Sequence, residues 1–143
     1  MAMRWTKALS VGMESIDEQH KELFRRAAGF LDGLGSKSRQ DVGVLLSYLR
    51  AYAVAHFGEE EELMRSARYP GYERHKQQHD RFLRDLVSLS NEQEKRHGTG
   101  VPPGRLAAWV EEWLVQHLGK TDTEMVKFFR SQRRGAGRAA PQR

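Results

Sequence analysis

The feature that most constrains the fold is the helical spacing of apolar residues, which repeats in four separate segments of the sequence. Apolar side chains recur at helical intervals in residues 15–34, 38–66, 70–90 and 105–130, and the alternation typical of strands is nowhere sustained. The connections are short, except for a longer one near residues 98–104. Four amphipathic helices with short links favour an all-α fold, an antiparallel up-down-up-down four-helix bundle.

Local signals predict where these helices begin and end. Ser15, with Glu18 three residues later, has the pattern of a capping box, and Gly33 and Gly35 break the first helical pattern. The second helix is expected to end before Pro70, which is well placed as the first residue of the third helix.

The composition excludes several classes of site. The chain has 143 residues, of which 38% are hydrophobic and none is cysteine. Disulfides, iron–sulfur clusters, thiolate zinc sites and cysteine nucleophiles are therefore excluded, and any metal must be held by histidines and carboxylates. No stretch approaches the ~20 apolar residues that cross a bilayer, and no secretory leader is visible, so we expect a soluble, cytoplasmic protein.

The net charge of +5 is concentrated at the C-terminus, where residues 130–143 hold five arginines and no acid. These are Arg130, Arg133, Arg134, Arg138 and Arg143. Without them, 19 basic residues balance 19 acidic ones. We expect a bundle in residues 1–130 followed by a basic flexible tail in residues 131–143, and the neutral body argues against a nucleic-acid partner.

Five of the six histidines lie on the apolar faces of the predicted helices. They are His20, His56, His75, His79 and His117, and only His97 falls in a loop. A single histidine on such a face is usually a hydrogen-bonded core residue. Five together, with at least one from each helix, each need polar partners that the surrounding leucine, phenylalanine and alanine do not offer, and a shared metal satisfies all of them.

The spacing of the histidines and nearby acids supports a metal site. His75 and His79 lie one helical turn apart, as do His56 and Glu60. Asp122 follows His117 by five residues, which on a regular α-helix places the two about 140° apart. We therefore expect a π-type widening of the helix between residues 118 and 122 if Asp122 belongs to the site.

The donor set favours two metal ions. Five imidazoles and two carboxylates are too many ligands for one tetrahedral zinc and too rich in nitrogen for calcium or magnesium. Two octahedral ions that share bridging carboxylates fit better. The only Glu-x-x-His is Glu94 to His97, which disfavours a ferritin-like site, and the His-Glu-x-x-His helix of zinc proteases is absent.

Four motifs in series resemble the hemerythrin family, and in particular its single-domain bacterial type, bacteriohemerythrin. On the four predicted helices in turn they read Val11-Gly12-x-x-x-Ile16-Asp17-x-Gln19-His20, then His56-Phe57-x-x-Glu60-Glu61-x-x-Met64, then Tyr69-Pro70-x-Tyr72-x-x-His75-x-x-x-His79, and finally Trp113-Leu114-x-x-His117-x-x-x-x-Asp122. The residues after Asp122 lack the aromatic side chain often found there in the family.

The resemblance implies a non-haem di-iron centre. His75, His79 and His117 would hold one iron, and His20 and His56 the other, which keeps an open position. Glu60 and Asp122 would bridge two iron ions (Fe2+/Fe3+) together with a solvent-derived oxo or hydroxo group. Dioxygen would bind reversibly at the open position, for storage, transport or delivery to an oxygen-consuming enzyme, in a chain that is not itself an enzyme and that we expect to be monomeric.

The neighbours of these ligands have predicted roles too. The expected walls of an oxygen pocket are Leu23, Phe24, Phe57, Trp113 and Leu114. Met64 is expected to pack in the core, because a thioether is a poor ligand for this iron. Glu59, Glu61 and Glu62 are expected on a solvated face, with the alternative that one of them orients a ligand imidazole.

Two other functions stay open at this point. The same irons would serve an enzyme of peroxidase-like, nitric-oxide-handling or iron-oxidising type. They would also serve a sensor module, in which oxygen binding changes the contacts with a partner.

Overall fold

The structure is a computed structural model that describes residues 5–10, 12–95, 98 and 100–139, with only the backbone described for residues 133–139. The helices are α1 (Glu14–Leu31), α2 (Arg39–Ser66), α3 (Tyr72–Gln93), α4 (Pro103–Trp113) and α5 (Asp122–Ala139). A π-helical segment, η3 (Leu114–Thr121), joins α4 to α5, and two short 3-10 turns, η1 (Lys7–Leu9) and η2 (Leu34–Ser36), flank α1. The described residues contain no strand.

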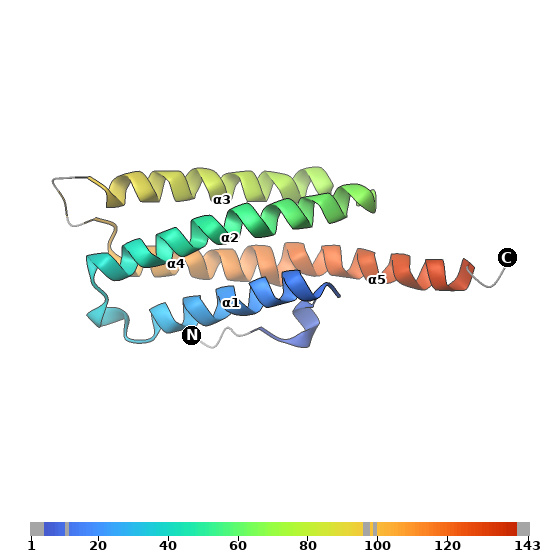
Figure 1. The fold of residues 1–143 in the computed structure, drawn as a ribbon, viewed down its shortest axis with the longest axis horizontal. Coiled ribbons are helices and arrows are strands. Elements are labelled where there is room, and N and C mark those ends of the chain that lie inside the picture. The colour runs from blue at the N-terminus through green and yellow to red at the C-terminus, as the bar shows by residue number, and fades with distance from the viewer. Residues whose placement is uncertain (1–4, 11, 96–97, 99, 140–143) are drawn as a thin grey trace.

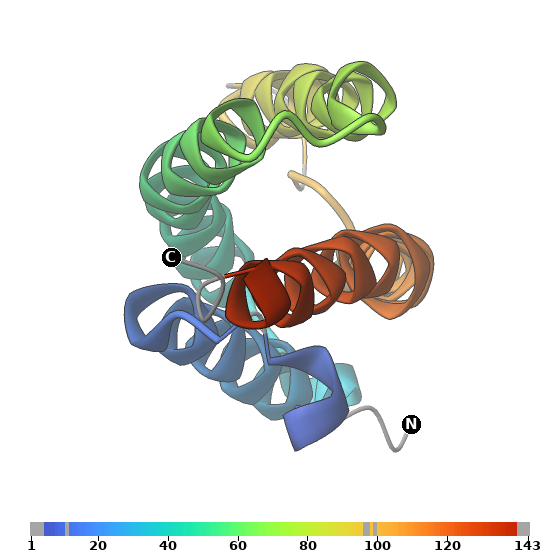
Figure 2. The same ribbon diagram turned by 90° about the vertical axis from the view of Figure 1, so that its right-hand side faces the viewer.

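The helices form the antiparallel bundle expected from the sequence. In Figure 1, α1 and α3 run in one direction, while α2 and the continuous rod formed by α4, η3 and α5 run in the other. Figure 2, which looks along the helices, shows that the four rods surround a common interior, with α2 between α1 and α3. None of the helices in the described ranges is both long and apolar enough to cross a membrane.

Local chemistry fixes two of the helix boundaries. Gly33 has a φ of 70°, in the left-handed region that glycine adopts without strain, and it directs the chain out of α1. Ser38 is the N-cap of α2: its hydroxyl accepts a hydrogen bond from the Asp41 backbone N–H, and the Asp41 carboxylate accepts one from the Ser38 N–H. This reciprocal pair is a capping box.

Three predicted boundaries are wrong. The first helix begins at Glu14 after Met13, and the Ser15 hydroxyl donates to Glu59 of α2 and caps nothing. A contact between helices therefore replaces the local cap expected from the sequence. Pro70 precedes α3, which begins at Tyr72 after Gly71. The last helix continues past residue 130 to Ala139. The mobility of residues 131–143 stays a prediction, and residues 140–143 lie outside the described ranges.

The buried apolar residues form two clusters. The larger one fills most of the bundle and includes Leu23, Leu49, Leu106 and Leu114. The smaller one consists of Ile16, Met64, Met125 and Val126. Met64 packs in this second cluster with no exposed surface, as predicted. A layer of buried polar residues belongs to neither cluster, and it is the part of the fold that apolar packing does not explain.

Replacing Ser38 with alanine should lower the free energy of unfolding by about 1 kcal/mol, because the α2 N-terminus loses its cap. Ser47→Ala is the matched control, since Ser47 lies on an exposed face inside α2, where alanine is at least as favourable. Urea unfolding followed by circular dichroism measures both changes. Equal stability of the two variants would contradict the capping role.

Candidate metal centre

The polar layer consists of the seven residues that were predicted from the sequence to be metal ligands. Each is at most 2% exposed, and together they are the buried polar residues of the described chain: His20, His56, Glu60, His75, His79, His117 and Asp122. They come from α1, α2, α3, η3 and α5, so every rod of the bundle contributes. His97, the histidine predicted to lie outside the site, falls among the residues that the structure does not describe.

These residues form two overlapping groups. One contains Glu60, His75, His79 and His117, and the other contains His20, His56, Glu60 and Asp122. Within each group, one potential ligand atom from every residue lies within 4.8 Å of the others. Glu60 belongs to both groups, which is the arrangement that a bridging carboxylate needs.

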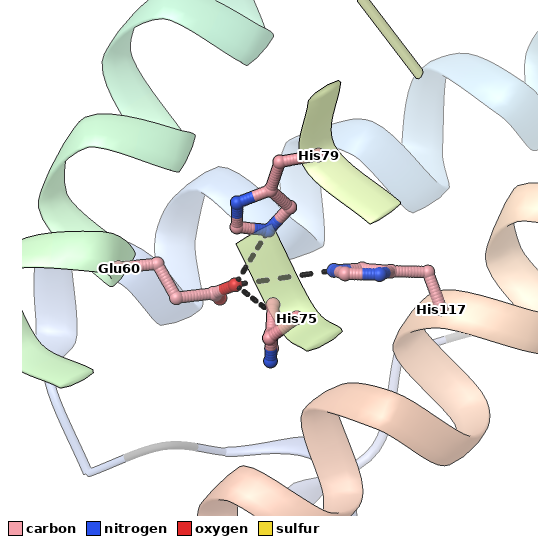
Figure 3. Close-up of side chains that lie close together, drawn as sticks. All are labelled: Glu60, His75, His79 and His117. Carbon is pink, nitrogen blue, oxygen red and sulfur yellow. Dashed lines mark hydrogen bonds and ion pairs between the residues drawn. The ribbon is translucent and has the colours of Figure 1, made fainter. Parts of the chain in front are cut away.

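The two oxygens of Glu60 face different imidazoles. Oε1 lies 2.7 Å from Nε2 of His75, 3.0 Å from Nε2 of His79 and 3.9 Å from Nε2 of His117. Figure 3 shows these three rings converging on the carboxylate from α3 and from the last rod. Oε2 lies 3.0 Å from Nε2 of His56 and 3.9 Å from Nε2 of His20.

Asp122 divides its oxygens in the same way. Oδ1 lies 2.9 Å from His75 and 3.1 Å from His117, whereas Oδ2 lies 3.5 Å from His20. Asp122 thus divides the three imidazoles that it faces along the same line as Glu60, with His75 and His117 on one side and His20 on the other. This division would be unnecessary if the carboxylates served only as hydrogen-bond acceptors for buried histidines.

The predicted widening of the last helix is present. Leu114–Thr121 is π-helical, and the backbone N–H of Asp122 donates to the carbonyl of His117, five residues earlier. The wider turn places residues five apart on one face, so His117 and Asp122 both point into the bundle. In a regular α-helix Asp122 would point about 140° away from His117.

Three of the imidazoles are oriented by a hydrogen bond at their other nitrogen. Nδ1 of His56 lies 2.9 Å from the Gln19 side-chain oxygen, Nδ1 of His79 lies 2.8 Å from the Glu61 carboxylate, and Nδ1 of His117 lies 2.8 Å from the side-chain oxygen of Gln78. An N–H at Nδ1 leaves the lone pair of Nε2 directed at the centre of the layer, which is the tautomer that binds a metal.

The four glutamates at positions 59–62 lie in the C-terminal half of α2, where the helix dipole disfavours negative charge. Each has a separate role that accounts for this position. Glu60 lies in the polar layer, Glu61 orients His79, and Glu59 accepts hydrogen bonds from Ser15 and Gln19. Glu59 and Glu62 lie on the solvated face that the sequence predicted, and Glu62 pairs there with Arg65. Glu61 is half-buried and fits the stated alternative, a carboxylate that orients a ligand imidazole.

Gln78 was not anticipated by the sequence analysis. Its side chain extends from α3 to His117 on η3. Helical periodicity within one segment does not reveal such a contact between two helices. Gln19 and Glu61, the partners of His56 and His79, lie inside the motifs that carry the family resemblance.

Comparison with known proteins agrees with this geometry. The family described as "Hemerythrin HHE cation binding domain" matches residues 11–129. The chain belongs to the hemerythrin family. Among its relatives, the bacteriohemerythrin of Methylococcus capsulatus is 31% identical over 122 residues, which are 84% of this chain and 91% of that protein.

More distant members of the hemerythrin family match over similar lengths. Hemerythrin subunit 1 of Golfingia vulgaris is 28% identical over 118 residues, 82% of this chain and 85% of that protein. The bacteriohemerythrin of Stenotrophomonas maltophilia is 29% identical over 119 residues, 82% of this chain and 75% of that protein. The similarity thus covers nearly the whole bundle.

The donor set fits a dinuclear metal centre of the kind the hemerythrin fold implies. Buried Glu60 Oε2, His117 Nε2 and both Asp122 oxygens have no hydrogen-bond partner among the described residues. Nε2 of His20 and Nε2 of His56 approach within 2.8 Å of one another. Unpartnered buried donors and acceptors are costly, and cations between these atoms would satisfy them together.

The pKa values in the metal-free chain show how this layer tolerates its charge. Burial lowers the pKa of His20 to about 4, with a further contribution from nearby His56, so the His20 imidazole is neutral near pH 7. Burial also acts to lower the pKa of His75, but its close pairing with the Asp122 and Glu60 carboxylates outweighs burial and raises that pKa to about 10. Protonated His75 thus partly compensates two buried carboxylates, a role that metal cations would take over.

Aromatic rings pack directly against the ligand imidazoles. Phe57 stacks on His79 with centroids 3.9 Å apart, and Trp113 stacks on His117 at the same separation. Leu23, Phe24 and Leu114 are buried in the larger apolar cluster, one helical turn from His20 or His117. The residues predicted as pocket walls therefore lie beside the ligands. An open groove of about 580 Å³ between α3 and the last rod includes His75 and His117 in its lining.

Glu61→Ala should weaken iron binding by about 10- to 100-fold, because His79 loses the acceptor that orients its ring. Glu62→Ala removes a carboxylate from the next residue, on the surface, and should leave iron affinity unchanged. Competition with a chelator of known affinity gives the comparison. An equally large loss of affinity in Glu62→Ala would mean that the effect comes from the lost negative charge, and it would contradict the orienting role of Glu61.

Proposed function

We propose that this chain holds two iron ions in the polar layer and binds dioxygen reversibly there. The observation that carries the proposal is the matched division of Glu60 and Asp122, each with one oxygen toward the three-histidine group and the other toward the two-histidine group. His75, His79 and His117 would hold one iron, His20 and His56 the other, and the two carboxylates would bridge them. A di-iron centre of this kind supplies two metal electrons that dioxygen can share reversibly.

The ligand set favours a carrier over an oxidising enzyme. Five imidazoles are neutral donors, and they leave only two carboxylates to neutralise the cations. A less anionic site stabilises high iron oxidation states less than a carboxylate-rich one does. The side chains therefore favour release of unchanged dioxygen.

Four of the five predicted walls of the oxygen pocket are buried, apolar side chains. Leu23 and Leu114 have no exposed surface, and Phe57 and Phe24 are 3% exposed. An apolar lining keeps out water that would protonate a bound ligand and promote its irreversible loss. Oxygen storage, transport or delivery to an oxygen-consuming enzyme are the uses that such a site would serve.

The test combines iron content with the optical spectrum of the anaerobically reduced chain, recorded before air, in air and after oxygen is removed. We expect two irons per chain and a charge-transfer band that appears with air and disappears again. Irreversible conversion to the ferric form would contradict reversible binding and favour an enzyme or a redox sensor. A chain that holds no iron would overturn the proposal.

His79→Ala and His117→Ala should each lose iron, and with it the stabilisation that binding gives the folded state, about 3 kcal/mol or more at saturating metal. His97→Ala is the matched control, because the sequence places it outside the helical faces, and it should change neither property. Metal analysis and thermal melting of the loaded proteins measure both effects. Loss of iron in His97→Ala, with iron retained in His79→Ala, would show that the ligand assignment is wrong.

A further inference from the structure

Tyr52 carries a buried hydroxyl group that the fold does not use. The residue is 5% exposed, and its oxygen has no hydrogen-bond partner among the described residues. A buried hydroxyl without a partner destabilises the folded chain relative to a phenylalanine of the same shape. Its position therefore suggests a partner that arrives with a ligand.

The Tyr52 ring lies over the two-histidine half of the centre. Tyr52 precedes His56 by one turn of α2, and the two rings stack with centroids 5.0 Å apart and an interplanar angle of 14°. The edges of Phe57 and Phe82 close around the ring. Tyr52 thus belongs to the wall that covers the metal layer on the side of the larger apolar cluster.

The hydroxyl end of Tyr52 lies near Trp113 of α4. The indole N–H of Trp113 lies near enough to the Tyr52 oxygen to moderate its pKa, yet that N–H too has no hydrogen-bond partner of good geometry among the described residues. Trp113 itself stacks on His117. The hydroxyl therefore lies between ring systems that contact His56 on one side and His117 on the other.

Tyr52 keeps its proton under all ordinary conditions. Burial raises its pKa well above the usual value, and the negative charges of Asp122 and Glu60 raise it further. The group is consequently a hydrogen-bond donor.

We propose that the Tyr52 hydroxyl donates a hydrogen bond to the small ligand that binds beside His20 and His56, and so makes the site select molecules that carry or gain negative charge on binding. This inference rests on the proposed function. Dioxygen, which accepts electron density on binding, and the azide anion belong to this class, whereas carbon monoxide, which stays nearly neutral, does not. A donor to a charged acceptor contributes more than a neutral hydrogen bond.

The experiment uses the full-length iron-loaded chain in its ferric form, with sodium azide as the probe. Tyr52→Phe removes one oxygen atom and keeps the ring. Tyr48→Phe makes the same change one turn earlier on α2, where the Tyr48 ring stacks on Tyr52 with centroids 6.4 Å apart. Azide affinity is measured by optical titration, and the azide stretching frequency is compared in H2O and D2O.

We expect Tyr52→Phe to weaken azide binding by about tenfold or more and to lose most of the D2O shift seen in the wild type. Tyr48→Phe should match the wild type in both. Unchanged azide affinity and an unchanged D2O shift in Tyr52→Phe would overturn the inference.

The thermal stability of the metal-free chain separates this role from a structural one. Tyr52→Phe should melt at the same temperature as the wild type or higher, because it removes an unpaired buried hydroxyl. A lower melting temperature with unchanged azide affinity would make the hydroxyl a structural group and contradict the proposal.

The two proposals fail in different ways. If the wild type binds dioxygen reversibly while Tyr52→Phe binds azide as well as the wild type does, only the inference about Tyr52 is overturned. If the iron-loaded wild type takes neither azide nor dioxygen, the proposed function is overturned, and the role of Tyr52 with it.

Discussion

The burial of two carboxylates between apolar clusters is the constraint on which the rest of the structure depends. Glu60 and Asp122 are at most 2% exposed, and isolated charges at such positions would cost far more than the chain's marginal stability allows. The five imidazoles that surround them come from every rod of the bundle, so the helices converge where the charge must be compensated. In our account two iron ions complete that compensation, and the apolar clusters on either side keep the layer dry.

Much of this arrangement could be predicted from residue spacing. Helical periodicity placed five histidines on buried faces, and the five-residue step from His117 to Asp122 required the π-helical turn that η3 supplies. What periodicity could not give are contacts between helices. Ser15 donates to Glu59 of α2 and does not cap α1, and Gln78 of α3 contacts His117. Both contacts depend on how neighbouring helices pack side by side.

The residues around the polar layer do two things: they orient the ligand imidazoles, and they limit the access of water. Gln19, Glu61 and Gln78 fix three of the imidazoles through their Nδ1 nitrogens, while Phe57 and Trp113 hold two of the rings by stacking. Oriented neutral donors and dry walls are both requirements for a ligand that must leave unchanged. Membership of the hemerythrin family is consistent with that use, and Tyr52 would add selectivity to it.

The most direct test of the central claim is anomalous X-ray scattering at the iron absorption edge from crystals of the iron-loaded chain. Our account predicts two peaks within the polar layer, one bordered by His75, His79 and His117 and the other by His20 and His56, with the carboxylates of Glu60 and Asp122 reaching both. A single peak, or two peaks with Asp122 turned toward solvent, would contradict it.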